Sequence, residues 1–345
     1  MTLSTRTSSS CGLAQIFLGV MLLAGAGPTS ALAAPPLGGV LQAAKDYPLP
    51  GRSTRWDYMS FDAVRAQMVI AHLGDSAVVV VDAKTKAVIG TVDHISDVHG
   101  VLVIPELDRI YASATGSNEA VAVDARTLKI MARIPTGKYP DGIAYAPSAH
   151  KIYVSNVNGE NLTVIDVRSN KSVATIALGS SVGNTQYDAG TRHIFVNVQG
   201  TKELVEIDPA TDAIIERTVI PGARGNHGLL IEPTLRLAFI ACEGNDLLIV
   251  LDLRTKKVVT QFHVGKGPDV LGYDTSQHRL YVASESGVVS VFNVSAAGVT
   301  LAGEGFVGPN AHTLAVDPST HEVYFPLKER GQPPVLRIMQ PVSSK

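Results

Sequence analysis

Aspartate and histidine alternate at one position of a regularly spaced series in this chain of 345 residues. The series reads Asp57, His99, Asp141, Gly183, His227, Asp269 and His312, so its successive members are 42 to 44 residues apart. Neutral imidazole and carboxylate groups can bind a divalent transition metal, transfer protons, or hold a polar ligand by hydrogen bonds. Each of these uses requires that residues distant in sequence converge on one place.

The chemistry of this series is open to three interpretations. The side chains could form a ligand-binding or catalytic site, and His99, His227 and His312 could bind a divalent transition metal as a cofactor. No short ligand spacing such as H-E-x-x-H accompanies them. Alternatively, aspartate at this position caps a repeated turn, and histidine replaces it in three copies. The sequence leaves the catalytic residues unknown, and it contains no P-loop.

A repeat of about 42 residues underlies the series. Short runs of β-branched residues end in Asp82, Asp124, Asp166, Asp208, Asp252 and Asn293, at intervals of 42, 42, 42, 44 and 41 residues. An aromatic residue in an apolar run lies about thirteen residues before most of these acids. A period of this length is typical of a repeated supersecondary unit.

Each copy is expected to be a four-stranded antiparallel sheet. The third copy shows four runs rich in β-branched and aromatic residues, 142–145, 151–155, 162–165 and 172–176, and turn residues separate them. We call these strands A to D. The acid after strand C precedes a tight turn, and its carboxylate can accept hydrogen bonds from the backbone amides of that turn.

The sequence predicts an all-β fold, a seven-bladed β-propeller of four-stranded antiparallel blades. The seven members of the Asp/His series mark seven strand A entrances, and stacking such sheets around an axis buries both of their faces. The last copy has no strand D of its own, whereas residues 41–51 resemble one. We therefore expect the ring to be closed by the N-terminal strand.

This layout places further polar residues around one mouth of the central channel. The D-to-A connections and the B-to-C loops open on the same face as the strand A entrances. They carry Asn156, Asn197 and Glu243 in or beside B-to-C loops, and the cations Lys138 and Arg224 in D-to-A connections. Arg224 lies in a lengthened connection before His227, from which it could reach an anionic group. A solvated loop arginine is the simpler reading of this residue.

The repeat also resembles a known family. Tyr153-Val154-Ser155-Asn156, residues 162–166 and residues 140–144 are similar to the motifs of the YVTN-repeat β-propeller family (YncE-like). The resemblance implies an extracytoplasmic propeller over nearly the whole chain. It carries little information about activity, because propellers host many unrelated functions.

The N-terminus and the charge balance bear on location and partners. Residues 1–33 combine Arg6, an apolar run over 12–24 and small residues at Ala31 and Ala33, which predicts a signal peptide. The expected propeller domain then spans 34–341, with a short tail at 342–345. With 29 Lys+Arg against 31 Asp+Glu, neither sign is gathered in a long run, so we expect no nucleic-acid partner. We further expect no membrane span after cleavage, and a periplasmic or secreted monomer.

Three classes of function remain open from the sequence. The leading one is a propeller that binds a small ligand or an envelope protein at the mouth. The second is a lyase or hydrolase that uses the His/Asp cluster there, with or without a divalent metal, and Arg224 or Lys138 to hold an anionic substrate. The third is a structural module of the cell envelope.

Overall fold

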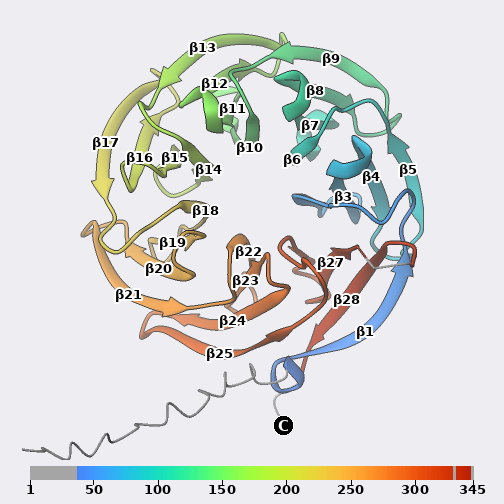
Figure 1. Ribbon diagram of the computed structural model, residues 1–345. Coiled ribbons are helices and arrows are strands. Elements are labelled where there is room, and N and C mark those ends of the chain that lie inside the picture. The colour runs from blue at the N-terminus through green and yellow to red at the C-terminus, as the bar shows by residue number, and fades with distance from the viewer. Residues whose placement is uncertain (1–36, 329–331, 343–345) are drawn as a thin grey trace, which may run out of the picture. The chain divides into compact units, whose positions relative to one another are not determined.

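A computed structural model describes residues 37–328 and 332–342, which belong to one compact unit. Within them, seven antiparallel sheets of four strands each are arranged around a central axis, as predicted (Figure 1). The unit is a seven-bladed β-propeller. The signal-peptide prediction for 1–33 and residues 343–345 of the predicted tail lie outside the described residues. No helix within the described ranges is long and apolar enough to cross a membrane.

The strands follow one another outward from the axis in each blade. The strands nearest the axis, A, are β2 (Met59–Asp62), β6 (Val98–Ile104), β10 (Pro140–Ala146), β14 (Val182–Asp188), β18 (Asn226–Glu232), β22 (Pro268–Asp274) and β26 (Ala315–Val316). Strands B are β3 (Gln67–His72), β7 (Arg109–Ala114), β11 (Lys151–Asn156), β15 (His193–Val198), β19 (Leu237–Cys242), β23 (Arg279–Ser284) and β27 (Val323–Leu327).

The two outer strands complete the blades. Strands C are β4 (Ala77–Asp82), β8 (Glu119–Asp124), β12 (Asn161–Asp166), β16 (Glu203–Asp208), β20 (Leu247–Asp252), β24 (Val288–Ser295) and β28 (Val335–Pro341). Strands D are β5 (Val88–Val92), β9 (Ile130–Pro135), β13 (Lys171–Ala177), β17 (Ala213–Val219), β21 (Lys257–His263), β25 (Gly298–Phe306) and β1 (Leu41–Pro48). Short 3-10 turns are η1 (Leu37–Gly39), η2 (Leu73–Asp75), η3 (Pro105–Leu107), η4 (Thr115–Ser117), η5 (Pro147–Ala149) and η6 (Val157–Gly159).

The N-terminal strand closes the ring. β1 pairs antiparallel with β28 from Leu41 opposite Pro341 to Pro48 opposite Val335, so the last sheet has the order β1-β28-β27-β26. The guanidinium of Arg337 on β28 forms an ion pair with Asp46 on β1. Figure 1 shows β1, in blue, alongside β28, in red. Closure by a strand from the other end of the chain is therefore confirmed.

Packing between blades and polar turns explains why the repeat folds in this way. The aromatic residue of each strand B from blade two onward is almost fully buried: Tyr111, Tyr153, Phe195, Phe239, Tyr281 and Tyr324. The acid at the end of strand C accepts hydrogen bonds from backbone amides of the following turn. Asp166, for example, accepts from the amides of Arg168 at 3.0 Å and Ser169 at 2.9 Å. These aspartates are part of the scaffold.

Two entrances differ from the expected layout. Asp57 and His312 precede their strands β2 and β26 instead of lying inside them. The backbone is nevertheless held there, because the Asp57 amide donates to the Ala71 carbonyl and the His312 carbonyl accepts from the Val270 amide. The seven entrances thus keep equivalent places around the axis, although two of them lie before the paired part of strand A.

Candidate functional site

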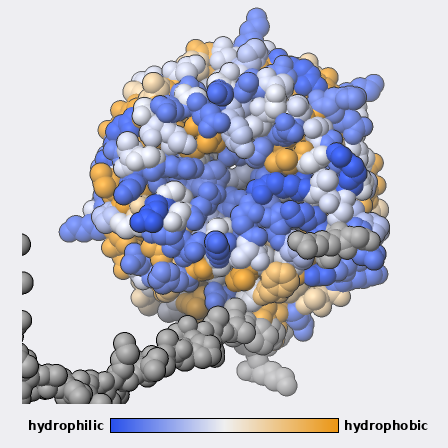
Figure 2. Space-filling model, in the orientation of Figure 1, coloured by the Kyte–Doolittle hydropathy of each residue, from blue (hydrophilic) through white to orange (hydrophobic). Residues whose placement is uncertain are grey.

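A polar cavity of about 490 Å³ occupies the channel end at which the strand A entrances lie. We call it the mouth cavity. Its lining comprises Arg55, Asp57, Tyr58, His99, Tyr139, Asp141, Val157, Asn158, Gln199, His227, Glu243, Asp269 and Glu285. Figure 2 shows hydrophilic residues around the centre of the ring on the face turned to the viewer.

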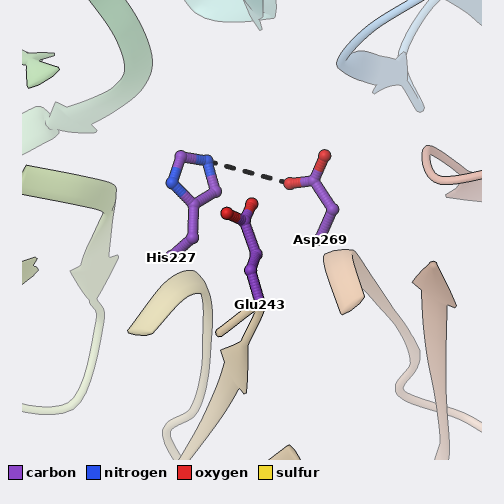
Figure 3. A group of neighbouring side chains, drawn as sticks. All are labelled: His227, Glu243 and Asp269. Atoms are coloured by element: carbon purple, nitrogen blue, oxygen red, sulfur yellow. Dashed lines mark ion pairs between the residues drawn. The ribbon is translucent and has the colours of Figure 1, made fainter. Parts of the chain in front are cut away.

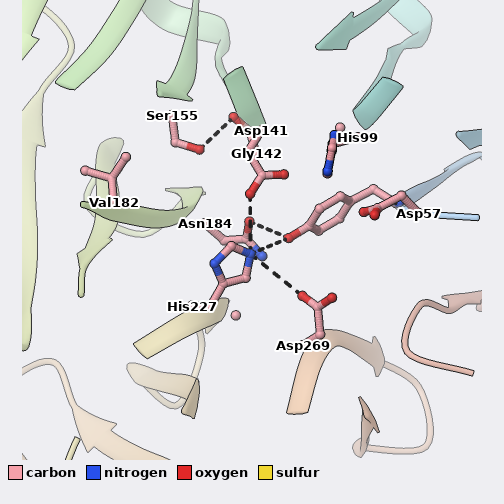
Figure 4. A network of polar contacts seen from close by, with 12 residues as sticks. Asp57, His99, Asp141, Gly142, Ser155, Val182, Asn184, His227 and Asp269 are labelled. Atoms are coloured by element: carbon pink, nitrogen blue, oxygen red, sulfur yellow. Dashed lines mark hydrogen bonds and ion pairs between the residues drawn. The ribbon is translucent and has the colours of Figure 1, made fainter. Parts of the chain in front are cut away.

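The structure brings most of the predicted entrance residues together. Asp57, His99, Asp141, His227 and Asp269 all line the mouth cavity (Figure 4). Glycine follows several entrances because the next blade passes close by: a Cβ at Gly100 or Gly228 would overlap the main chain of Asp141 or Asp269, respectively.

His312 lies just behind the cavity wall. It is 1% exposed, and its Nε2 is 3.8 Å from Asp57 Oδ2 and 4.0 Å from Asp269 Oδ2. Its Nδ1 lies 2.9 Å from the Asn310 carbonyl oxygen, which fixes the proton of a neutral ring on Nδ1. Among the described residues, Nε2 has no hydrogen-bond partner.

The polar residues predicted in or beside the B-to-C loops divide into two groups. Glu243 lines the cavity. Asn156 and Asn197 are buried: Asn156 donates to Asn161 and Thr163 of its own blade, and Asn197 donates to the main-chain carbonyls of His227 at 3.2 Å and Gly228 at 3.0 Å. Asn197 therefore positions the His227 backbone from the neighbouring blade.

The two predicted cations, Lys138 and Arg224, are exposed and lie outside the residues that line the cavity. The lengthened connection before His227 does not bring Arg224 to the lining, because its backbone packs against Gly244 and its side chain faces solvent. The cation that lines the mouth is Arg55, two residues before Asp57. Its Nε is 3.2 Å from Asp57 Oδ2, and its guanidinium lies 2.8 Å from Glu285 Oε1.

His227 is the centre of a polar network that crosses the channel (Figure 4). Its Nδ1 lies 2.8 Å from the side-chain amide of Gln199, and its Nε2 is 3.4 Å from Asp141 Oδ2. Tyr58 extends from blade one, where its hydroxyl donates to Asn184 Oδ1 at 2.7 Å and lies 3.2 Å from His227 Nε2. Side chains of blades one, three, four and five thus meet at one imidazole.

His99 also lines the mouth cavity, but its contacts differ from those of His227. Its Nδ1 lies 2.9 Å from the Asp97 carbonyl oxygen and 2.8 Å from Thr115 Oγ1. Its Nε2 is 3.3 Å from the Tyr139 hydroxyl, and the two rings are 5.3 Å apart. No carboxylate oxygen of the described residues lies within ion-pair distance of His99. The structure therefore separates His99 from the other two predicted metal-binding histidines.

Burial and mutual charge shift the pKa values of these groups in opposite directions. Burial raises the pKa of Asp141, and it raises the pKa of Asp269 to about 7 despite the attraction of His227 and His312. Burial opposes the charged form of Asp57 too, but the interaction with the nearby His312 imidazole lowers its pKa to about 2. For His227, burial is outweighed by Asp141, Glu243 and Asp269, which raise its pKa to about 9.

The cavity carries an excess of acidic groups. Five carboxylates and one guanidinium are among the described residues of its lining, the carboxylates being Asp57, Asp141, Glu243, Asp269 and Glu285. Within the described part of the chain, Oδ1 of Asp141 and Oδ1 of Asp269 are buried without a hydrogen-bond partner. Buried polar atoms in folded proteins nearly always have partners, so these two oxygens indicate a place for a ligand.

Two groups of side chains among the described residues have atoms close enough to share a metal ion. His227, Glu243 and Asp269 form one group (Figure 3), and Asp269, Glu285 and His312 form the other. In each group the ligand atoms lie within 4.8 Å of one another. The predicted set of three histidines does not converge, whereas mixed sets of one histidine and two carboxylates do.

Sequence reasoning missed Arg55, Tyr58, Tyr139, Gln199 and Asn184. Tyr58 occupies the position that holds glycine in blades two, three and five, and this departure was a usable signal. Arg55 could have been found from its place directly before an entrance residue. Nothing in the repeat pattern distinguished Gln199 or Tyr139 from other loop residues.

A second cavity of about 740 Å³ lies on the face of the A-to-B turns. Its lining includes Leu230, Pro233, Tyr273 and Val294 and is mostly apolar. Although it is larger, the carboxylates and histidines of the entrance series lie at the other end of the channel. The mouth cavity is therefore the candidate functional site.

Comparisons with known proteins show the fold and no closer relationship. No protein-family model matches the chain, and no curated protein matches it. Among solved structures, the chain is similar to a chain of hydrazine synthase from Kuenenia stuttgartiensis, at 16% identity and a TM-score of 0.71 over 81% of this chain and 94% of that one. It is also similar to the WD40 repeats of RRP9, at 11% identity and a TM-score of 0.74 over 88% of this chain and 100% of that one.

Proposed function

We propose that this propeller binds a small cationic ligand in the mouth cavity. The observation that carries the proposal is the pair of buried carboxylate oxygens without hydrogen-bond partners among the described residues, Oδ1 of Asp141 and Oδ1 of Asp269, in a lining with more acids than cations. Burying a carboxylate without a partner is costly, and a bound cation removes that cost. A volume of about 490 Å³ is within the range of small-molecule sites.

The test is a titration of the purified protein with cations of two kinds. Isothermal calorimetry with Zn²⁺, Mn²⁺ and putrescine, and with phosphate as an anionic control, should give heat for at least one cation and none for phosphate. The Asp141→Asn/Asp269→Asn double variant should lose that heat. Glu106→Gln, which removes an exposed carboxylate of the η3 turn, should retain it. Equal binding by the double variant, or no binding of any cation, would refute the proposal.

An acid–base enzyme, a lyase or hydrolase, is a second candidate because Asp269, with a pKa of about 7, lies beside His227. Such a carboxyl can exchange a proton near neutral pH. The positions of Arg224 and Lys138 give this candidate no cation at the lining to hold an anionic substrate, and Arg55 is engaged by two carboxylates. Hydrolysis of nitrophenyl esters or phosphates that is lost in Asp269→Asn would favour it over binding alone.

We further propose that the chain is exported and belongs with the YVTN-repeat propellers. The supporting observations are the apolar run over 12–24 with Ala31 and Ala33, and the motifs around Tyr153. Mass spectrometry of the protein from separated cell fractions tests export: a mature N-terminus near residue 34 is expected outside the cytoplasm. Recovery of the whole chain in the cytoplasm would reject it, together with the proposed role in the cell envelope.

A further inference from the structure

The carboxylate of Asp269 lies between two histidines, with one oxygen toward each. Oδ1 is 3.8 Å from His227 Nε2, and Oδ2 is 4.0 Å from His312 Nε2. Both distances exceed the 2.7 to 3.2 Å that is typical of a nitrogen–oxygen hydrogen bond. Asp269 therefore faces both imidazoles without bonding directly to either.

Each histidine also has further carboxylates on the side where it faces Asp269. Glu243 joins His227 (Figure 3), and Glu285 joins His312. All ligand atoms of each group lie within 4.8 Å of one another. Asp141 Oδ2 lies 3.4 Å from His227 Nε2, and Asp57 Oδ2 lies 3.8 Å from His312 Nε2. The arrangement is one nitrogen and several oxygens on either side of a shared carboxylate.

We infer that the mouth cavity holds two divalent transition-metal ions bridged by Asp269, one bound by His227 and Glu243 and the other by His312 and Glu285. This inference rests on the proposed cation-binding function and specifies its ligand. Imidazole together with carboxylate suits ions such as Zn²⁺ and Mn²⁺ better than Mg²⁺ or Ca²⁺, which prefer oxygen alone.

The spacing of the ligand atoms fits a shared ion. A metal bonds imidazole nitrogen and carboxylate oxygen at about 2.0 to 2.2 Å, so two ligands on one tetrahedral ion are roughly 3.4 Å apart. Asp269 lies 3.8 Å from His227 and 4.0 Å from His312, and all ligand atoms of each group lie within 4.8 Å, so the side chains must move together by up to about 1.4 Å to share an ion. Two ions on opposite oxygens of one carboxylate would lie at the spacing of about 3.5 to 4 Å that two-metal sites show.

Unpartnered buried atoms support both sides of the bridge. His312 Nε2 and Asp269 Oδ1 have no hydrogen-bond partner among the described residues, and their residues are 1% and 5% exposed. The Asn310 carbonyl holds the His312 ring so that its Nε2 lone pair faces Asp269, which is the usual way a protein orients a metal-binding histidine. On the other side, the Gln199 side-chain nitrogen lies 2.8 Å from His227 Nδ1, so metal binding at Nε2 requires this amide to turn its oxygen toward Nδ1 and accept the ring proton.

The two halves of the site are not equivalent. Glu285 is already engaged by Arg55 at 2.8 Å and by the Asn310 side chain, whereas Glu243 has no such cation near it in the part of the chain that the structure describes. The ion on the His312 side must displace the Arg55 contact. The His227 side should therefore fill first, and the two binding steps should differ in affinity.

The experiment is a metal count on purified protein stripped with a chelator and dialysed against Zn²⁺. Two ions per chain are expected, and Asp269→Asn should weaken the binding of both by more than about tenfold. His227→Gln and His312→Gln should each retain one ion, and Glu106→Gln should retain both. The melting temperature of each variant without metal shows whether it is folded, since His312 is buried.

A spectroscopic readout tests the bridge itself. Mn²⁺ ions that share a carboxylate are magnetically coupled, so the electron paramagnetic resonance spectrum of the loaded protein should be broadened, and Asp269→Asn should remove the coupling. One ion per chain, or two uncoupled ions, would overturn the inference and leave cation binding intact. Putrescine binding without metal binding would have the same consequence. Failure to bind any cation would overturn both proposals.

Discussion

Replacement of Asp269 by asparagine should stabilise the cation-free protein above neutral pH. The residue is 5% exposed, one carboxylate oxygen has no hydrogen-bond partner in the described chain, and burial raises its pKa to about 7 from the ordinary 3.8. A carboxyl whose pKa is higher in the folded than in the unfolded chain destabilises the fold where it is ionised. The cost is complete above the folded pKa and absent below the unfolded pKa.

The size of the effect follows from the shift. A change from 3.8 to about 7 corresponds to roughly 4 kcal/mol at about 1.36 kcal/mol per pKa unit. This is an upper limit, because Asp269 also raises the pKa of His227 and His312 and so contributes to their stabilising charge. With about 2 °C of melting temperature per kcal/mol in a domain of this size, we expect a rise of up to about 8 °C near pH 8.

Thermal melts in a metal chelator near pH 8 and near pH 4 provide the assay. Fluorescence of Trp56, the single tryptophan of the chain, reports on unfolding, because this ring is 2% exposed and stacked on His72. Asp269→Asn should raise the melting temperature near pH 8 and leave it nearly unchanged near pH 4. Glu106→Gln is the control. An unchanged or lower melting temperature near pH 8 would refute the argument that the carboxylate lies unpartnered at a cost.

Three further predictions concern other parts of the molecule. Deletion of residues 34–51 removes β1 and should lower the melting temperature markedly by exposing the edge of β28; an unchanged value would contradict closure as a source of stability. His227→Gln should reduce the loss of stability that the wild type shows as pH rises from about 6.5 to 9, because a pKa raised to about 9 stabilises the fold only while the ring is protonated. An unaltered pH profile would contradict this. In protein without residues 1–33, and so without Cys11, Cys242 is fully buried and has a thiol pKa raised by burial to about 11. It should react with Ellman's reagent only on unfolding, so fast reaction of this native protein would argue against its burial.

The repeat carried most of the information about the fold. Equivalent positions of the 42-residue copies lie at the same point of their sheets. The period alone therefore places Asp57, His99, Asp141, His227 and Asp269 at one end of the channel. The lack of a strand D in the last copy likewise predicted that residues 41–51 close the ring. Equivalent positions in a cyclic repeat converge whatever their side chains are, so this inference needed no side-chain geometry.

The arrangement of the site depends on side-chain contacts and loop conformations, which the repeat period does not predict. Arg224 was expected over the channel because its connection is long, yet the extra residues are used in backbone contacts with Gly244, and its side chain faces solvent. Asn197 belongs to the scaffold because its amide is saturated by main-chain carbonyls of the next blade. The three histidines were grouped by type, whereas the hydrogen bonds of His99 hold it away from the carboxylates that surround the other two.

Tyr58 gives the mouth cavity a floor and so decides from which side a ligand enters. Its side chain crosses from blade one to Asn184 of blade four and lines both the mouth cavity and a narrow cavity of about 150 Å³ deeper in the channel. The deeper space is bounded by strand A residues of several blades, such as Leu102, Ile143 and Leu229, and offers a desolvated cation no carboxylate among its described lining. We therefore expect the proposed cation to exchange with solvent through the face of the D-to-A and B-to-C loops. The carboxylates of Glu243 and Glu285 should attract it there before it reaches Asp141 and Asp269.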